Sequence, residues 1–248
     1  MSAEFRVFSS SNLEVGKQFV SNSPDGKYVR TLLQTGFVAP NQSLTGFIDR
    51  FTPSLDDFPG SNKILCIGAK VISLLQGRYI RKDDIKTGTF ARIASRFGTK
   101  TEHGVGVAGY PEKLQTAIDE VGMPRVVFAS GVSALEKVVV RSGIIKKPIG
   151  LFFIIAGKRV EAIDGIVPDG GYHNHVILCP DDYKTLAETL TIETKIPIAI
   201  VDINYIGGSV LSISHNAPLT KKEVFSALSD NPFGQDKKRI PLAVIGRN

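Results

Sequence analysis

The chain has only two cysteines and no long hydrophobic run, and each shortage argues against a class of protein. Cys66 and Cys179 lie inside apolar runs, so we expect buried thiols, with no spacing that suits a disulfide or a two-cysteine metal site. No run approaches the roughly 20 apolar residues of a membrane span, and the N-terminus lacks the apolar segment of a secretory signal. We therefore expect a cytoplasmic protein with no membrane partner.

The net charge of +6 and the isoelectric point of about 9.3 raise the question of nucleic acid. The basic residues are dispersed in short pairs, such as Lys146-Lys147 and Lys221-Lys222, without aromatic residues between them. No nucleic-acid-binding module is recognisable. Such a charge also suits a protein whose ligands are phosphates and carboxylates. We therefore favour small anions as ligands, and nucleic acid is the weakest alternative.

The motifs of three common enzyme classes are missing. The sequence has no Gly-x-Ser-x-Gly of serine hydrolases, no phosphate loop of P-loop NTPases and no His-Glu-x-x-His of zinc proteases. Gly104-Val-Gly-Val-Ala-Gly109 matches the dinucleotide fingerprint literally. That fingerprint follows a strand, whereas a polar stretch precedes it here, so a Rossmann site is disfavoured.

Apolar segments alternate with amphipathic ones, which predicts an α+β fold with mixed sheets and flanking helices. We expect one domain over residues 1–248, and the pattern also allows two lobes. Residues 1–62 are rich in Ser, Asn, Gly and Pro, with short β-like pieces at Tyr28–Leu33 and Leu44–Phe51, and residues 63–248 form an α/β core. The predicted core strands are rich in Val, Ile and Phe and bounded by Gly or Pro: Lys63–Gly68, Arg125–Ala129, Ile149–Ala156, Arg159–Ile163, His175–Cys179, Pro197–Val201 and Leu242–Ile245.

The predicted helices are marked by their ends. Pro111–Val121 begins with proline and stops at a glycine. Asp181 and Asp182 offer caps to a helix over Tyr183–Leu190. Thr220-Lys-Lys-Glu223 is a capping box that opens a helix to about Leu228. A fourth helix is expected over Phe90–Phe97.

Asp164 and Asp202 each stand where an apolar, strand-like run breaks into glycines. An unpaired carboxylate out of water is costly and needs a partner or a metal. Two such carboxylates suit a divalent cation that in turn holds phosphate, because Mg²⁺ is hard and prefers oxygen. The alternative is that each aspartate simply begins a turn.

Lys70, Ser73 and Arg78 follow the predicted strand at Lys63–Gly68 directly. A strand that turns into a short helix presents backbone N–H groups and cationic side chains to an anion, although an ordinary surface helix explains the same residues. His173 and His175 would share one face of an extended segment. Since no third zinc ligand lies at a fitting distance, His173 is instead a candidate for hydrogen bonding or proton transfer, and a structural role is the alternative.

Several segments are similar to those of one enzyme family. Ile64–Arg78 looks like a strand–helix segment that ends Ser-Lys-Ala-Glu-Gly-Arg, and Ala162–Gly165 looks like an Ala-Gly-Ile-Asp metal motif. Ile200–Asp202 looks like the family's second metal-binding aspartate. Tyr110–Asp119 and Asp230–Gln235 are similar to a bacterial branch. From about Lys63 onward the chain therefore resembles the coenzyme F(420)-0:L-glutamate ligase family, the γ-glutamyl ligases, as a divergent bacterial-type member.

The resemblance implies a homodimer that binds GTP with Mg²⁺ or Mn²⁺. The family activates a carboxylate as an acyl phosphate, and the amine of L-glutamate then attacks it to form an amide. The cation neutralises phosphate charge and holds the transferring group in line. By resemblance, the metal ligands would be Asp164 and Asp202. The groups near the nucleotide would be Lys70, Ser73, Arg78, Asn204, Gly207 and Gly208.

Four positions depart from the family pattern. Leu74 replaces a nucleotide-contacting lysine, and Gln76 replaces a glutamate. Ile203 stands where a threonine follows the metal-binding aspartate, and Val167 stands where an asparagine contacts the nucleotide. Losing one cationic phosphate contact costs about 1.5–3 kcal/mol, so the sequence leaves open whether GTP, ATP or no nucleotide is used. The acceptor is also open, and folate or another γ-carboxylate would serve. A non-catalytic or nucleotide-independent binding protein on the same scaffold is the alternative from a different class.

Overall fold

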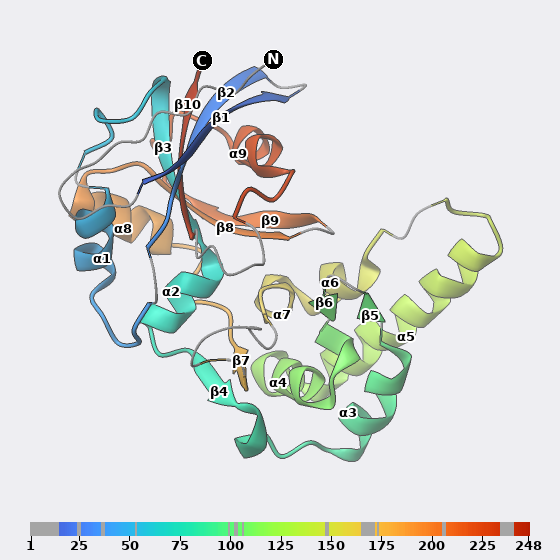
Figure 1. Cartoon of the computed structure of the whole chain (residues 1–248). Coiled ribbons are helices and arrows are strands. Elements are labelled where there is room, and N and C mark those ends of the chain that lie inside the picture. The colour runs from blue at the N-terminus through green and yellow to red at the C-terminus, as the bar shows by residue number, and fades with distance from the viewer. Residues whose placement is uncertain are drawn as a thin grey trace. The chain divides into compact units, whose positions relative to one another are not determined.

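The computed structural model describes residues 15–23, 26–35, 38–52, 54–98, 100–101, 104–105, 107–146, 149–164, 172, 174–204, 207–233 and 241–248. The chain divides into two units, which are described separately (Figure 1). The sheet unit comprises Met1–Arg78 and Pro180–Asn248, and the helical unit comprises Tyr79–Cys179. The single domain expected over residues 1–248 stays a prediction.

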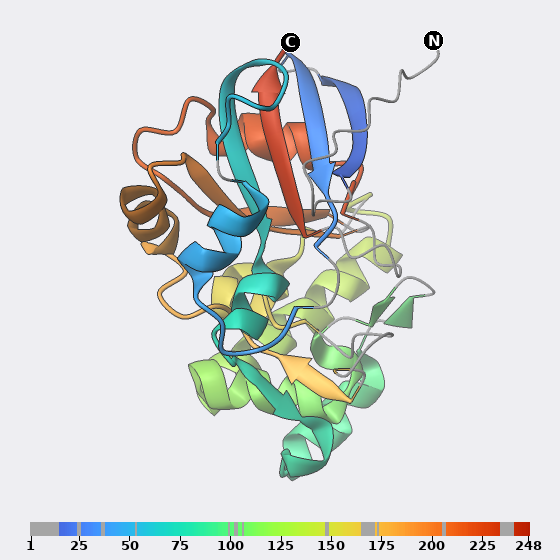
Figure 2. The ribbon, with the colours of Figure 1, turned by 60° about the vertical axis from the view of Figure 1, so that its left-hand side comes forward.

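The sheet unit is built on six strands in the order β1-β2-β10-β3-β8-β9. Neighbouring strands are antiparallel, except that β3 and β8 run parallel. Its elements are β1 (Val15–Ser23), β2 (Gly26–Leu33), α1 (Leu44–Phe51), β3 (Ser61–Gly68), α2 (Ala69–Leu75), α8 (Leu186–Thr194), β8 (Ile198–Asn204), β9 (Gly207–Ile213), α9 (Lys221–Leu228) and β10 (Leu242–Arg247). Figures 1 and 2 show α9 on one face of the sheet and α1 and α8 on the other. The predicted mixed α+β class is thereby confirmed.

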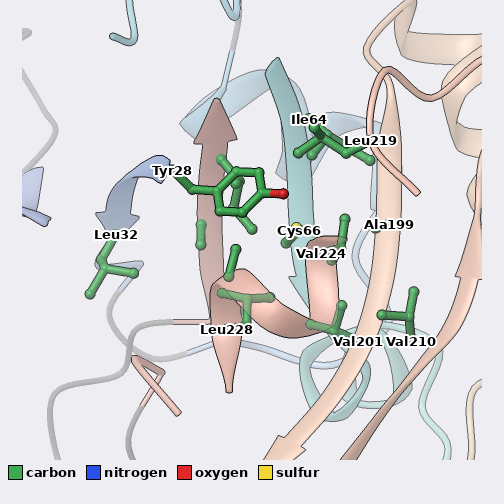
Figure 3. Close-up of a cluster of buried hydrophobic side chains, with 13 residues drawn as sticks. Tyr28, Leu32, Ile64, Cys66, Ala199, Val201, Val210, Leu219, Val224 and Leu228 are labelled. Atoms are coloured by element: carbon green, nitrogen blue, oxygen red, sulfur yellow. The ribbon is translucent and has the colours of Figure 1, made fainter. Parts of the chain in front are cut away.

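The three central strands are buried on both faces. Ile64 and Cys66 of β3 belong to the core cluster under α9 (Figure 3). Because side chains alternate along a strand, Leu65 and Ile67 point to the opposite face, and they are equally buried. Two-sided burial explains why β3, β8 and β10 are continuous apolar runs rather than alternating ones. The predicted strands at Lys63–Gly68, Pro197–Val201 and Leu242–Ile245 are therefore confirmed. Burial raises the pKa of the Cys66 thiol, and neither cysteine forms a disulfide.

The N-terminus of α9 is attached to the sheet through Glu223. The predicted capping box is confirmed: the Glu223 N–H donates to the Thr220 hydroxyl (3.3 Å), and the Glu223 carboxylate accepts from the Thr220 N–H (2.8 Å). The same carboxylate accepts from the Tyr28 hydroxyl of β2 (3.4 Å) and from Arg247 of β10 (2.6 Å). Since Tyr28 and Arg247 are register partners, one side chain joins the helix to two paired strands.

The C-terminus of α9 is attached to the sheet through Arg30 of β2. This arginine is buried, and its guanidinium binds both carboxylate oxygens of Asp230 and the backbone oxygen of Ala227 (2.9 Å). A cation at the C-terminal end of a helix and a carboxylate at its N-terminal end both complement the helix dipole. The direction of α9 on the sheet is therefore specified by charge as well as by apolar packing.

The helical unit contains short helices and two small two-stranded sheets, β4-β7 and β5-β6. Its elements are β4 (Tyr79–Arg81), η1 (Lys82–Asp84), α3 (Thr89–Ala94), η2 (Ser95–Phe97), β5 (Lys100–Thr101), β6 (Gly104–Val105), η3 (Val107–Gly109), α4 (Pro111–Val121), α5 (Met123–Arg141), α6 (Leu151–Ala156), α7 (Lys158–Glu161) and β7 (His175–Ile177). The buried face of α4, which includes Leu114 and Ala117, packs with α3, α5 and α7 in one apolar cluster. The predicted helix over Pro111–Val121 is confirmed, and α3 with η2 confirms the one over Phe90–Phe97.

Three predicted strands of this unit are helices instead. Arg125–Ala129 lies inside α5, where Val126 and Ala129 are buried and the residues between them are exposed. Ile149–Ala156 is mostly α6, and Arg159–Ile163 is mostly α7. Short runs rich in Val, Ile and Phe do not distinguish a strand from a buried helical turn, so the long-range packing decided against the local preference.

Long-range hydrogen bonds explain the start of α6. The carboxylate of Glu136 in α5 is buried and accepts from the N–H groups of Ile149 (2.5 Å), Gly150 (2.9 Å) and Leu151 (3.2 Å). These donors have no partner inside a helix that begins at Leu151. Glu136, thirteen residues before Ile149, therefore caps the N-terminus of α6 in place of a local residue. The N-cap residue of α6 provides no side-chain cap from which the helix could have been predicted.

Three further segments differ from the prediction. The segment Leu44–Phe51 is helix α1, because Ser43 caps it by accepting from the Gly46 N–H (3.1 Å) and because Phe47, Ile48 and Phe51 share a buried face. The helix expected over Tyr183–Leu190 is α8, which begins only at Leu186, since Asp182 has a left-handed φ of 48°. The strand expected over His175–Cys179 is shorter, ending at Ile177.

No helix in the described part of the chain is both long and apolar enough to cross a membrane.

Replacing Glu223 should destabilise the protein in a pH-dependent manner. The hydrogen bond from the Thr220 backbone, then the Thr220 hydroxyl and Arg247, lower the pKa of Glu223 below its ordinary 4.5, while burial opposes them. This contribution to stability is present above the unfolded pKa and is lost as the pH falls through the folded pKa. Glu223→Gln should lower the free energy of unfolding at pH 7 by about 0.5–2 kcal/mol, the range for losing a cap.

Urea unfolding at pH 7 and at pH 3 measures this effect. The gap between wild type and Glu223→Gln should shrink at the lower pH, while Glu193→Gln, at an exposed position of α8, should match wild type at both. A gap that stays constant across this range would contradict the assigned charge interaction.

Candidate functional site

The parallel pairing of β3 and β8 places several predicted site residues at one edge of the sheet. Gly68, the last residue of β3, is the register partner of Val201, the residue before Asp202. Helix α2 follows Gly68 directly and contacts β8 as well as β3. Lys70 of α2 and Asp202 of β8 therefore both come directly after the last paired residues, Gly68 and Val201, or within two residues of them, at the carboxyl end of the parallel pairing, which is where α/β sheets bind ligands.

Asp202 faces away from α9. Val201 and Ile203 pack in the cluster under that helix, so the alternation of side chains directs Asp202 and Asn204 to the opposite face. In the antiparallel pair of β8 with β9, Asp202 is opposite Ser209 and Asn204 is opposite Gly207. The half-buried carboxylate of Asp202 thus has a serine as its cross-strand neighbour, a residue that sequence analysis did not select.

Gly207 and Gly208 are needed for the backbone of this hairpin. Their φ values are 145° and 140°, which other residues rarely adopt. A Cβ atom at Gly208 would lie 2.1 Å from the backbone oxygen of Asp202, whereas one at Gly207 would meet nothing within 4 Å. The glycine at 208 therefore allows β9 to approach the backbone of Asp202 closely. That Gly207 and Gly208 lie near a nucleotide stays a prediction.

The two predicted nucleotide contacts on α2 differ in exposure. Lys70 is half-buried, whereas Ser73 is fully buried and its hydroxyl donates to the backbone oxygen of Ala69 (3.1 Å). A hydroxyl that bonds back to the preceding turn is a common helix-internal arrangement. Lys70 is therefore better placed than Ser73 to contact a ligand at this edge.

Arg78 lies beyond the end of α2, beside Asp181. Its guanidinium is 3.3 Å from the Asp181 carboxylate. The side-chain oxygen of Gln76, one of the positions that depart from the family pattern, accepts from the Asp181 N–H (2.9 Å). Both side chains thereby connect the segment after α2 to the turn before α8. A nucleotide-contacting role for Arg78 stays a prediction, and the ion pair gives this residue a structural role as well.

Asp164 belongs to the helical unit, where it forms an isolated bridge with Ile177. Its N–H donates to the Ile177 oxygen (3.0 Å), and its own backbone oxygen accepts from the Ile177 N–H (3.2 Å). The bridge extends the β4-β7 sheet by one residue pair. His173, the candidate for proton transfer, lies outside the described residues. Asp164 and Asp202 occur in different units, so one ion shared by both carboxylates stays a prediction.

Three aromatic rings pack together at the β4-β7 pair, one from each strand and one from Tyr172, and sequence analysis did not single out this group. Tyr79, Tyr172 and His175 lie edge to face, with ring centroids 5.1–5.6 Å apart. Burial, and then the neighbouring Tyr79, raise the pKa of Tyr172 above its ordinary value of 10. The Nδ1 atom of His175 is buried without a hydrogen-bond partner. This packing gives His175 a structural role, in line with one of the two alternatives for the histidine pair.

Among the described residues, no group of three or more His, Cys, Asp or Glu side chains could hold a metal ion. The oxygen-bearing side chains at the end of β8 belong to one carboxylate, one amide and one hydroxyl instead: Asp202, Asn204 and Ser209. Such a mixed set suits a hard cation that keeps several of its waters, as Mg²⁺ does. The candidate site is therefore this edge of the sheet unit, with Lys70 nearby.

Alanine at Gly208 should be more costly than alanine at Gly207. Both substitutions force a side chain into an unfavourable φ, which costs on the order of 1–3 kcal/mol. Only Gly208→Ala also places a Cβ against the backbone of Asp202, which cannot move aside as a flexible side chain would. We expect a lower urea midpoint for Gly208→Ala than for Gly207→Ala, and equal midpoints would contradict the close approach.

Comparison with known proteins leaves the family unassigned, because no protein-family model and no curated protein sequence matches the chain.

Proposed function

We propose that the protein is a cation- and nucleotide-dependent amide ligase that joins L-glutamate to a carboxylate acceptor through an acyl phosphate. The proposal rests first on the resemblance to the γ-glutamyl ligases. One observation supports it most: Asp202 and Asn204, in the last part of β8, and Lys70, just after β3, all lie beyond the last residue pair of the only parallel strand pairing described in the sheet unit. A carboxylate for a cation and an ammonium for a phosphate are the minimum that this chemistry requires.

The donor atoms at the end of β8 fit Mg²⁺ or Mn²⁺. Asp202 supplies a carboxylate, and Asn204 and Ser209 supply neutral oxygens on the same strand pair. When bound, such a cation offsets the negative charge of phosphate groups and orients them. Asp164 is proposed as the second carboxylate, as the resemblance implies.

The remaining side chains would bind and orient the reactants. The ammonium of Lys70 would attract phosphate oxygens, and Asn204 would offer an amide to the nucleotide. Gly207 and Gly208 leave the surface of the hairpin without side chains, so a ligand can approach its backbone. GTP is the nucleotide that the resemblance favours, with ATP as the alternative. The acceptor is proposed as a small carboxylate such as the deazaflavin coenzyme precursor, folate or another γ-carboxylate.

A second candidate is a binding protein that kept the scaffold and lost nucleotide turnover. Two predicted nucleotide contacts have partners within the protein, which favours this alternative. The Ser73 hydroxyl donates within its own helix, and Arg78 forms an ion pair with Asp181. Leu74, where the family has a lysine, is buried and cannot replace them. In this case the site at Asp202 would still bind a cation or a small anion, but nucleotide would have no effect.

The homodimer and the cytoplasmic location belong to the same proposal. Sedimentation velocity of the purified full chain tests the first, and a monomer at micromolar concentration would contradict it.

Asp202→Asn should abolish cation-dependent nucleotide binding without unfolding the protein. With GTP and Mn²⁺ at about 100 times Kd, wild type should gain about 2.7 kcal/mol of stability by mass action. The variant should gain none, because the amide carries no charge to hold the cation. Thermal unfolding with GTP alone, Mn²⁺ alone and both together measures this.

The matched control is Asp49→Asn, at an exposed position of α1 in the same unit. It should respond to GTP and Mn²⁺ as wild type does, and Asp164→Asn should behave like Asp202→Asn. Wild type that gains stability from Mn²⁺ but not from GTP would favour the binding protein. Indifference to both would remove the ligase proposal.

A further inference from the structure

Ser209 has a buried hydroxyl without a hydrogen-bond partner. The residue is 9% exposed, and within the described part of the chain no donor or acceptor is bonded to its Oγ atom. A hydroxyl can donate once and accept twice, and burying it unpaired costs about 1–3 kcal/mol. Each buried hydroxyl without a partner requires an explanation.

The position of Ser209 suggests what its oxygen is for. It is the register partner of Asp202, so the two side chains share one face with Cβ atoms about 4.5–5.5 Å apart. A serine beside a carboxylate would ordinarily donate to it, and here it does not. At this spacing, the Ser209 hydroxyl and the Asp202 carboxylate can both direct lone pairs at one divalent cation between them. P-loop enzymes hold Mg²⁺ in this way, with a Ser or Thr hydroxyl and an aspartate.

Position 203, occupied by Ile203, cannot supply a cation ligand beside Asp202. It follows Asp202 in sequence, but it packs in the apolar cluster on the opposite face of the sheet. Ser209, across the strand pair, can therefore add a hydroxyl beside Asp202, whereas position 203, the next in sequence, cannot.

We infer that Ser209 is a ligand of the divalent cation held by Asp202, bound through its neutral Oγ atom with the hydroxyl proton directed away from the ion. This inference rests on the proposed function in one respect, namely that Asp202 binds a cation. It adds a specific ligand and the reason for it: the hydroxyl is left unpaired in the protein because the cation is its partner.

Ser212 provides a matched control. It lies on β9 opposite Ile200, on the same face, and its Oγ is likewise buried and unpaired. It has an isoleucine rather than a carboxylate as its cross-strand neighbour. Any general effect of removing a buried hydroxyl from this strand should therefore occur at both positions, and only an effect on cation binding should be confined to Ser209.

The test is titration of the full-length protein with Mn²⁺ alone, followed by the loss of the free Mn²⁺ paramagnetic resonance signal. Ser209→Ala should raise the Kd for Mn²⁺ by at least about 10-fold, because loss of even an outer-shell partner has that effect. Ser212→Ala should leave the Kd within twofold of wild type. Ser209→Thr, which keeps the hydroxyl, should restore tight binding.

Stability without metal gives an independent readout. If the hydroxyl is unpaired in the metal-free protein, Ser209→Ala should be as stable as wild type or more stable in chelator. Saturating Mn²⁺ should reverse the order, because wild type then gains more by mass action. A merely structural serine would instead make the variant less stable in chelator. The Ser209→Cys variant should lose Mn²⁺ affinity and gain Zn²⁺ affinity relative to Ser212→Cys, because thiolate is a soft ligand.

The outcomes separate the two proposals. Loss of Mn²⁺ binding in Asp202→Asn, with Ser209→Ala and Ser212→Ala both equal to wild type, would overturn the role of Ser209 and leave the Asp202 site standing. Wild type that does not bind Mn²⁺, or Asp202→Asn that binds it normally, would overturn the cation site itself. Selective weakening by Ser209→Ala, with rescue by threonine, supports the inference.

Discussion

The parallel pairing of β3 with β8 is the constraint on which the candidate site depends. A strand in an antiparallel sheet can be followed by a tight hairpin, but two parallel neighbours require a long crossover. Between β3 and β8 the chain passes through α2, the whole helical unit and α8. Because both strands run towards the same edge, Lys70 and Asp202, which are 132 positions apart in sequence, both lie at the carboxyl end of this pairing. With an antiparallel pairing, the same residues would lie at opposite edges.

The docking of α9 supports this arrangement from the other face. Side chains alternate along a strand, so a slip of one residue in β8 would turn Asp202 into the apolar cluster under α9 and expose Val201. The apolar surface of α9 opposes such a slip by packing against Val201 and its neighbours. Arg30 and Glu223 hold the two ends of the helix on β2 and β10, so the helix has one position and one direction. The orientation of the Asp202 carboxylate thus depends on residues that do not contact it.

Sequence patterns predicted the sheet unit better than the helical unit, for a physical reason. A strand buried on both faces, such as Lys63–Gly68, needs apolar residues at every position, and its ends carry Gly or Pro. In the helical unit, equally apolar runs such as Ile149–Ala156 became helices, and the carboxylate that caps α6 comes from Glu136. Sequence analysis selected Asp202 as a candidate because a charge at the end of an apolar run is unusual. It did not select Ser209, because only the hairpin register places this serine opposite Asp202.

Three features near Asp202 depart from the rules of stable folding. Gly208 adopts a φ of 140° and excludes any side chain, Ser209 buries an unpaired hydroxyl, and the pairing of β8 with β9 is irregular between Ile200 and Val201. Buried hydroxyls without a partner also occur elsewhere in the sheet unit, at Thr31, Thr52 and Ser212, so it is the combination of these features beside one carboxylate that distinguishes the end of β8. A sequence selected for stability alone would remove a strained glycine and an unpaired hydroxyl within a few residues of each other, because each costs free energy without benefit to the fold. Their retention beside one carboxylate is what a binding site requires, where free energy lost in the unliganded protein is recovered when the ligand binds.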